Sequence, residues 1–215
     1  KVEKYSEDSQ NAQLIIVRLV NDECNISLDT SGAPLHQRGY RQALAKAPLR
    51  ETLAAGILLA SGWDQRSPLV DPFCGSGAIP IEATLMAMRI PPGRKRRFAF
   101  MEWPGFDLAA WEYAVADADG HIQSPAAPIL ASDRDAGSVK MALENAARAG
   151  VAEWVQITQR AVSAVEPPSQ PGWVVTNPPY GLRVSSVQDL RNLYAQFGNL
   201  LRARFAGWQV SFLCN

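Results

Sequence analysis

Short apolar runs alternate with polar, turn-forming residues along the whole chain, and each run predicts a strand or a helix. Two β-rich runs at 14–20 and 24–30 flank the tripeptide Asn-Asp-Glu, which is the pattern of a β-hairpin. The segment that follows the hairpin is basic and irregular. Residues 49–61 are rich in helix formers, and Pro48 suits the first turn of a helix, so we expect a helix there.

From residue 62 onward, runs of strand length alternate with runs of helix length. Gly150 fits a helix C-cap, and the long connection that begins at Pro91 is interpreted as an insertion. Alternating helices and Val- and Ile-rich strands predict an α/β fold, with a Rossmann-like, mostly parallel sheet covered by helices on both faces. We expect strands at 69–70, 127–135, 154–158, 173–176 and 208–215, and helices at 78–90, 108–117, 136–149 and 190–205.

A glycine-rich turn joins the first strand of this expected sheet to its helix. The motif DPFCGSG begins at Asp71, and Gly75 and Gly77 let the backbone approach a ligand beneath the helix N-terminus. The motif is neither GxGxxG nor a phosphate-binding P-loop. Asp71 would repel a pyrophosphate and favour a cationic group such as the ammonium of an amino acid. A plain strand-to-helix turn is the alternative interpretation.

Asp133 ends the next expected strand. At this position in a doubly wound sheet, a carboxylate hydrogen-bonds the ribose hydroxyls of a bound nucleoside, and solvation in a loop is the alternative. Asp135 is expected to be the N-cap of the helix that follows.

The stretch WVVTNPPYGLR ends a buried strand on two consecutive prolines, which neither a helix nor a sheet accommodates. The Asn177 amide oxygen and the Pro178 carbonyl would then be two acceptors at fixed positions near the ring of Tyr180. Such a pair suits a planar exocyclic amine, whose lone pair becomes free to attack once both N–H groups are bound. The ring would stack on the base, and a base inside a helix would have to flip out. A Pro-rich turn without chemistry is the alternative.

The motifs DPFCGSGAIPIEA and TNPPYG resemble those of class I, S-adenosylmethionine-dependent amino-methyltransferases. The segments LDTSGAPLHQRGYR, APLRETLAAGILLASGW, FAFMEWPGFD and SDRD narrow the resemblance to THUMP-associated RNA methyltransferases. The most similar type is the bacterial large-subunit rRNA guanine 2-amino methyltransferase, over about residues 14–215. The resemblance implies S-adenosyl-L-methionine as cofactor and RNA as partner (rRNA, or tRNA as the alternative). Transfer of the cofactor's partly positive methyl group needs no metal, and the three widely spaced cysteines suit a reducing cytosol, so we expect a cytoplasmic location.

The resemblance also implies roles for individual residues. The implied cofactor-binding residues are Pro48, Leu49, Asp71, Pro72, Phe73, Gly75, Ser76, Gly77, Asp133 and Arg134. The residues implied to hold the target base are Asn177, Pro178, Pro179 and Tyr180. The residues implied to lie near the RNA substrate are Arg38, Tyr40, Arg41, Arg94, Lys95, Arg96 and Arg97, with a solvated run of charges as the alternative for the last four.

The chain departs from the family pattern in two places. Where the family has an acid to hold the adenine amine, this chain has Arg160 and Ala161, so backbone or apolar contacts would have to hold adenine. The family also continues into two more strands and carries an upstream THUMP module, and this chain begins without Met, so we expect a fragment. We therefore expect 1–47 to be a hairpin and basic linker, the remnant of an RNA-binding region, and 48–215 to be the methyltransferase domain without its last strands.

Composition narrows the classes of protein further. The 215 residues are 47% hydrophobic and 20% charged, as in ordinary globular proteins, and the formal net charge is zero, so a polyanion would have to be met by a local patch. Three widely spaced cysteines and two histidines argue against a zinc site and a disulfide framework. No apolar run approaches the ~20 residues that span a bilayer.

Three functional hypotheses follow from the sequence. The first is in-line methyl transfer to the 2-amino group of a guanine in RNA. The second keeps the cofactor and changes the acceptor, to the 6-amino group of adenine in DNA or the amide of a protein glutamine. The third is a catalytically inert RNA-binding domain, which Ala161 and the missing strands would favour.

Overall fold

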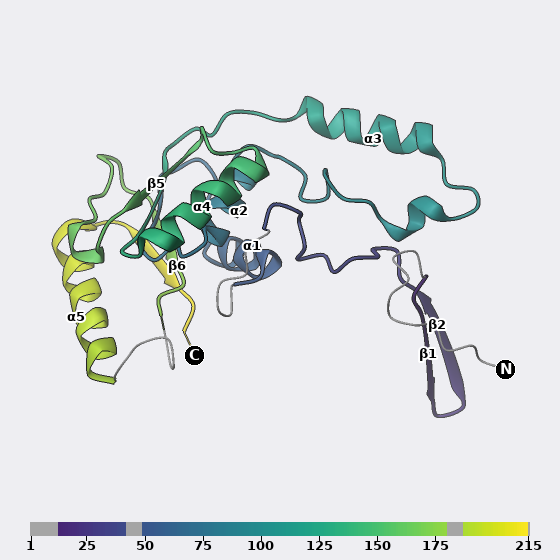
Figure 1. The fold of residues 1–215 in the computed structure, drawn as a ribbon, viewed down its shortest axis with the longest axis horizontal. Helices are drawn as coiled ribbons and strands as arrows, with labels where there is room; N and C mark the ends of the chain where they lie inside the picture. Colours follow the sequence, from purple (N-terminus) through teal and green to yellow (C-terminus); the bar gives the residue numbers. More distant parts are fainter. Residues whose placement is uncertain (1–12, 42–48, 180–186, 215) are drawn as a thin grey trace.

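The computed structural model describes residues 13–41, 49–179 and 187–214, and its main element is a five-stranded sheet (Figure 1). The strand order is β5-β4-β3-β6-β7, and every adjacent pair is parallel. The strands are β3 (Leu69–Asp71), β4 (Ile129–Asp133), β5 (Val155–Gln159), β6 (Trp173–Thr176) and β7 (Gln209–Phe212). Along the chain, the central strand β3 comes first, β4 and β5 follow on one side of it, and β6 and β7 complete the other side.

Helices cover both faces of this sheet. The helices α1 (Glu51–Ala60), α2 (Ala78–Ala87) and α4 (Ala136–Ala149) contribute to the larger apolar cluster on one face. The helix α5 (Val187–Arg204) and the 3-10 turn η2 (Val162–Ala164) contribute to a second cluster on the opposite face. The two layers confirm the expected fold class.

Alternation along the central strands explains why two clusters form. Leu69 and Val175 belong to the larger cluster, whereas their neighbours Val70 and Val174 belong to the smaller one. Successive side chains of a strand point to opposite faces, so both faces of β3 and β6 are buried. Each such side chain stabilises the fold by roughly 1.5–3 kcal/mol.

The strands β1 (Ile15–Val20) and β2 (Glu23–Leu28) form an antiparallel hairpin, which lies apart from the sheet in Figure 1. The two residues between them, Asn21 and Asp22, have φ values of 50° and 62°. Positive φ at both positions is the requirement of the tight turn that matches strand twist, and Asn and Asp tolerate it well. The expected hairpin is therefore confirmed.

The insertion after α2 carries the 3-10 turn η1 (Ala99–Glu102) and the helix α3 (Leu108–Gly120). Four aromatic rings hold it together through contacts of 5.4–5.8 Å between centroids. These rings belong to Phe98, Phe100, Phe106 and Trp111. Trp103 donates a hydrogen bond to Gln13 at 2.6 Å and so connects the insertion to the chain just before the hairpin.

The two expected caps of α4 are present, and α2 is shorter than expected. Asp135 caps α4 by accepting a hydrogen bond from the Ser138 backbone at 2.6 Å, and Gly150 ends the helix with φ at 81°. The helix α2 ends at Ala87 rather than at residue 90, because Arg89 adopts a positive φ of 57°. Among the helices of the described ranges, none is both long and apolar enough to cross a membrane.

Candidate functional site

The carboxyl ends of β3, β4 and β6 meet at one edge of the sheet. The strand order reverses there, since β3 has β4 on one side and β6 on the other. Ligands of open α/β sheets bind outside such a switch point. A cavity of about 730 Å³ lies at this edge. Its lining residues are Pro72, Phe73, Gly75, Asp133, Arg134, Ser138, Ala161, Val162, Asn177, Pro179, Asn192, Leu193 and Gln196.

The turn after β3 is fixed to the neighbouring strand by backbone contacts. Cys74 N donates to Ser132 O at 2.9 Å, and the turn enters α2 through Gly77, whose φ is 88°. A Cβ at Gly77 would lie 3.1 Å from Ala142 Cβ, so helix packing also requires glycine there. Neither Gly77 nor Ser76, whose carbonyl accepts from α4, lines the cavity. Ser76 and Gly77, both expected to bind the cofactor, therefore contact α4 and fix the turn from outside the cavity.

Asp71 lies under the turn rather than on the cavity wall. It is 1% exposed, and its Oδ1 accepts hydrogen bonds from Thr176 Oγ1 at 2.5 Å and from Phe73 N at 3.1 Å. Burial raises the pKa of this carboxyl to about 7, although both hydrogen bonds lower it, and the charge of Asp133 adds to the rise. Asp71 therefore joins β3 to β6 and holds the turn.

Asp133 lines the cavity, and each of its carboxylate oxygens accepts one hydrogen bond from the backbone. Oδ2 accepts from Gly75 N at 3.0 Å, and Oδ1 accepts from Asp135 N at 2.9 Å. Each carboxylate oxygen has two lone-pair directions, so both keep acceptor capacity toward the cavity. This orientation suits a pair of donor hydroxyls. Across the described ranges, no group of three or more His, Cys, Asp or Glu side chains could hold a metal ion.

Asn177 directly follows β6 and lines the same cavity. Its Oδ1 is buried and has no hydrogen-bond partner within the described part of the chain. A buried acceptor without a partner costs roughly 1–3 kcal/mol, so such atoms are rare and call for an explanation. Pro178 is buried and Pro179 lines the cavity, while Tyr180 lies outside the described residues.

The remaining walls come from two segments on the opposite face of the sheet. Ala161 and Val162 contribute one wall, and α5 contributes Asn192 and Gln196. Sequence reasoning did not identify the α5 residues. The spacing of four places these two polar side chains on one helix face, and that pattern could have indicated them.

The residues of this edge lie in a segment that matches a family model. Residues 38–214 match the RMKL-like methyltransferase domain. The chain belongs to this family.

Curated relatives of this methyltransferase domain include proteins named Ribosomal RNA large subunit methyltransferase K/L. One from a Shewanella species is 43% identical over 202 residues, and one from Shewanella oneidensis is 42% identical over 201 residues. Both matches cover 91% of this chain but only 28% of the relative, so the chain spans under a third of their length.

Solved structures similar to the methyltransferase domain share its fold. SMU.472, assigned as a methyltransferase and solved in complex with S-adenosylhomocysteine (SAH), is 33% identical with a TM-score of 0.85, over 93% of this chain and 52% of that one. A predicted N6-adenine-specific DNA methylase from Listeria monocytogenes is 35% identical with a TM-score of 0.82, over 92% of this chain and 52% of that one. TrmN from Thermus thermophilus, at 21% identity and a TM-score of 0.64 over 93% of this chain and 48% of that one, agrees in fold alone.

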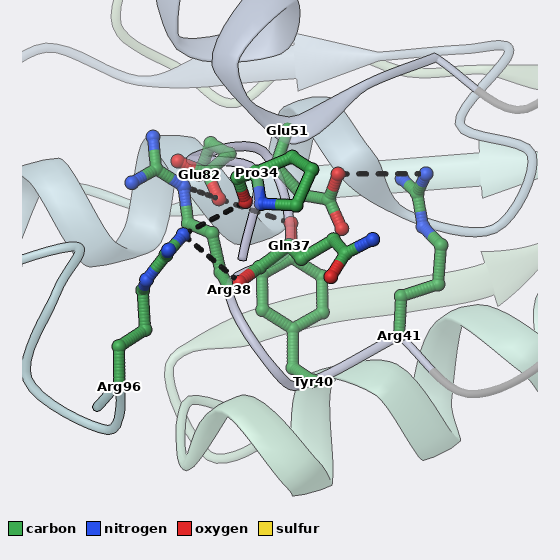
Figure 2. A network of polar contacts seen from close by, with 8 residues as sticks. All are labelled: Pro34, Gln37, Arg38, Tyr40, Arg41, Glu51, Glu82 and Arg96. Carbon is green, nitrogen blue, oxygen red and sulfur yellow. Dashed lines mark hydrogen bonds and ion pairs between the residues drawn. The ribbon is translucent and has the colours of Figure 1, made fainter. Parts of the chain in front are cut away.

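Three side chains of the RGYR segment, those of Arg38, Tyr40 and Arg41, meet acids of α1 and α2 (Figure 2). Tyr40 is 4% exposed and donates to Glu82 Oε1 at 3.0 Å, the same oxygen that lies 3.0 Å from Arg38 Nε. Arg41 Nη1 lies 3.8 Å from Glu51 Oε2. Burial raises the pKa of Glu82 to about 7, although the Arg38 charge and the Tyr40 hydrogen bond lower it.

The structure shows Arg38 and Tyr40 engaged by Glu82, and their expected contact with RNA stays a prediction. Arg38 Nε lies 3.0 Å from Glu82 Oε1, so the Glu82 carboxylate compensates the charge of Arg38 at close range. Both residues instead attach the segment before α1 to α2. Leu49, expected near the cofactor, packs against the larger apolar cluster, and Pro48 lies outside the described residues.

Two of the four basic residues after α2 are engaged by acids. Arg94 donates two hydrogen bonds to Asp119, at 2.6 and 2.9 Å, and so attaches the basic run to α3. Arg97 pairs with Glu102 at the surface. The charges of these two arginines are largely compensated.

The other two basic residues bind neutral carbonyl groups. Lys95 Nζ donates to the Arg148 carbonyl at 3.0 Å, and Arg96 Nη1 donates to the carbonyls of Pro34 and Gln37 at 2.9 and 3.3 Å (Figure 2). A carbonyl fixes the position of a cation without neutralising it. Lys95 and Arg96 therefore keep their full charge.

Proposed function

We propose that this domain transfers a methyl group from S-adenosylmethionine to the 2-amino group of a guanine in ribosomal RNA. The observation that carries the proposal is the unpaired Oδ1 of Asn177 on the wall of the same cavity as Asp133. A buried acceptor of this kind is the group that an exocyclic N–H would satisfy.

The cavity offers suitable groups for the cofactor. Asp133 keeps acceptor capacity for ribose hydroxyls, and Phe73 and Val162 offer apolar surface for a flat adenine ring. Gly75 keeps the turn open where the methionine moiety would pass, since nothing lies within 4 Å of where its Cβ would be. The solved relative with bound SAH supports the same cofactor here.

The chain's own residues would prepare the acceptor. When bound, S-adenosylmethionine supplies an electrophilic methyl group on a sulfonium. Asn177 Oδ1 and the Pro178 carbonyl accept the two N–H groups of the amine, which exposes the nitrogen lone pair toward the methyl carbon. Asn177 and Pro178 would thus hold the amine for in-line transfer of that methyl group, and the proton of the amine would leave to water. Positioning and electrostatics supply the catalysis, and no general base is assigned.

Ribosomal RNA is the substrate class we favour, with tRNA as the alternative RNA. The relatives named above are large-subunit rRNA methyltransferases and support this choice, whereas the Listeria structure's name supports adenine in DNA as a second acceptor. Digestion of the methylated product to nucleosides separates them, because the methyl group would be on a guanine amine in one case and an adenine amine in the other. We also propose a cytoplasmic location, where such RNA would be met.

We further propose that residues 1–47 belong to an RNA-binding region and that 48–215 form the catalytic domain. The family match that begins at residue 38 and the separate hairpin support a division near this point.

The proposal is tested by Asn177→Ala. Removing the acceptor should lower the rate of methyl transfer by roughly 100-fold or more, as losses of positioned hydrogen-bonding groups do. Binding of S-adenosylmethionine, measured by calorimetry, should stay within about twofold, because Asp133 and the glycine turn are unchanged.

Asn177→Asp is the matched variant, since it keeps an acceptor oxygen at the same position. Its transfer rate should lie above that of the alanine variant. A near-normal rate in Asn177→Ala would refute this account of the site. Absence of any cofactor binding by the unaltered chain would favour the inert RNA-binding domain.

A further inference from the structure

A second cavity, of about 690 Å³, lies beside the first turn of α1 and shares no lining residue with the first. We call it the cationic cavity. Its charged lining residues are Arg41, Arg50, Glu51, Lys95, Arg96 and Arg97. Five cations and one carboxylate thus surround one hollow in a chain whose formal net charge is zero.

Arg41 is buried in this cavity with unused donors. Its side chain is 8% exposed, and the 3.8 Å that separates it from Glu51 is too long for a hydrogen bond. Its Nε and Nη2 have no hydrogen-bond partner among the residues that the structure describes. Figure 2 shows Arg41 extended toward Glu51, on the opposite side of Tyr40 from Arg96. Unpaired buried donors of a charged group are unfavourable, so a ligand that accepts from them is expected.

Two further cations of the cavity remain electrostatically uncompensated. Lys95 and Arg96 donate only to neutral carbonyls in the bonds described above, and Arg96 Nε is a further buried donor without a described partner. Arg50 is exposed at the rim. The potential inside the cavity is therefore positive despite Glu51.

The helix α1 adds backbone donors to the same place. Its N-cap residue is Arg50, and in the described structure no side chain caps this end. The first-turn N–H groups, including those of Thr52 and Leu53, and the helix dipole favour an anion. The buried guanidinium of Arg41, whose Nε and Nη2 have no described hydrogen-bond partner, is independent of this feature and points to the same class of ligand.

We propose that the cationic cavity binds a backbone phosphate of the RNA substrate, an inference that rests on the proposed function for the identity of the polyanion. The planar guanidinium of Arg41 matches the two non-bridging oxygens of a phosphodiester, and Arg50 and Lys95 complete the charge balance. The Glu51 carboxylate repels the phosphate and therefore weakens its binding.

The first test compares two exposed arginines near opposite ends of α1. Arg50→Gln removes a rim charge of the cavity, whereas Arg66→Gln removes an equally exposed charge in the loop after the helix. RNA affinity is measured by fluorescence anisotropy with a labelled stem-loop RNA that contains an unpaired guanine, between about 50 and 200 mM salt. Arg50→Gln should make the slope of log affinity against log salt about one unit shallower, and Arg66→Gln should leave it unchanged.

The second test predicts a gain in RNA affinity, which an unfolded variant would not show. Glu51→Gln removes the one carboxylate of the cavity, so RNA should bind more tightly, by about threefold or more at the lower salt, with a steeper salt slope. Glu153→Gln removes an exposed carboxylate that precedes β5 and does not line the cationic cavity, so it is the charge-matched control and should not alter the affinity.

Equal salt slopes for Arg50→Gln and Arg66→Gln, or no gain in Glu51→Gln, would overturn the inference. Pyrophosphate that binds in an Arg50-dependent way but is not displaced by RNA would assign a small phosphorylated ligand instead and would also overturn it. Failure of methyl transfer with these binding effects intact would contradict the proposed function alone.

Discussion

At the scale of single residues, the proposed chemistry depends on where acceptors are satisfied and where they are not. Asp71 and Asp133 accept hydrogen bonds from the turn and its neighbours, whereas Asn177 Oδ1 has no partner within the described residues. Native structures rarely leave a buried acceptor unpaired. The consecutive prolines after Asn177 have no backbone N–H to offer this oxygen, so the acceptor stays available to a substrate.

Ala161 leads to a prediction about cofactor affinity. It lines the cavity at the carboxyl ends of β3, β4 and β6, where we propose that the cofactor binds, and a carboxylate there could accept a hydrogen bond from the adenine amine. Ala161→Asp should therefore tighten S-adenosylmethionine binding by about tenfold, equivalent to ~1.4 kcal/mol. Isothermal titration calorimetry measures the change. Ala164→Asp, three residues further along the chain and outside the cavity, is the control and should not change cofactor binding. Unchanged or weaker binding in Ala161→Asp would contradict the placement of adenine beside Ala161.

At the scale of elements, the site is built where two central strands end side by side. The hydrogen bond of 2.5 Å between Thr176 of β6 and Asp71 of β3 connects these ends inside the core. It holds the Asn177 segment next to the glycine turn. The Asp71 carboxyl of this hydrogen bond is buried, and burial raises its pKa to about 7.

The raised pKa predicts how stability changes with pH. The native state holds the Asp71 proton up to about pH 7, while the unfolded chain releases it near pH 4, so the unfolding free energy falls as pH rises between these values. One such group contributes a slope of up to about 1.4 kcal/mol per pH unit. Glu82, with its pKa also raised to about 7, adds in the same direction. Urea denaturation from pH 5 to pH 8 should show this decline.

Asp71→Asn isolates the contribution of the Asp71 carboxyl to the pH dependence of the unfolding free energy. The variant should lose less stability than the natural chain over the same pH interval, since only the Glu82 contribution remains. Asp117→Asn makes the same chemical change on the exposed helix α3 and should leave the decline unaltered. An identical pH dependence in Asp71→Asn and the natural chain would show that Asp71 is ionised in the native state.

Much of this element arrangement could be predicted from the sequence, because local chemistry determines it. Strand length, apolar alternation and the positions of Gly77, Asp135 and Gly150 are signals that act within a few residues. Parallel strands bring their carboxyl ends to one edge, so Asp133 and Asn177 were expected to line one cavity, and both line it.

The partners of the buried polar residues could not be predicted in this way. Tyr40 meets Glu82 across 42 residues of sequence, and a single sequence does not record which distant acid pairs with which arginine. The sequence therefore predicts RNA contacts for Arg38, Tyr40 and Arg41 but not their pairing with Glu82 and Glu51. The α5 wall was missed for the same reason, because packing on the sheet decides which helix face is turned to the cavity.

At the scale of the whole molecule, charge is organised locally. Formal net charge is zero, so long-range attraction cannot concentrate the chain on RNA. The cationic cavity beside α1 supplies a local field instead, and the cavity proposed for the cofactor lies at the edge where β3, β4 and β6 end. The chain spans 28% of the length of a curated relative of the family.

The most direct test is to incubate the protein with methyl-labelled S-adenosylmethionine and unmodified ribosomal RNA and then map the labelled nucleotide. We predict label at a single guanine of the large-subunit RNA, recovered after digestion as the nucleoside methylated on its 2-amino group, and absent with Asn177→Ala. Label on adenine or on protein, or cofactor binding without any transfer to RNA, would contradict the account.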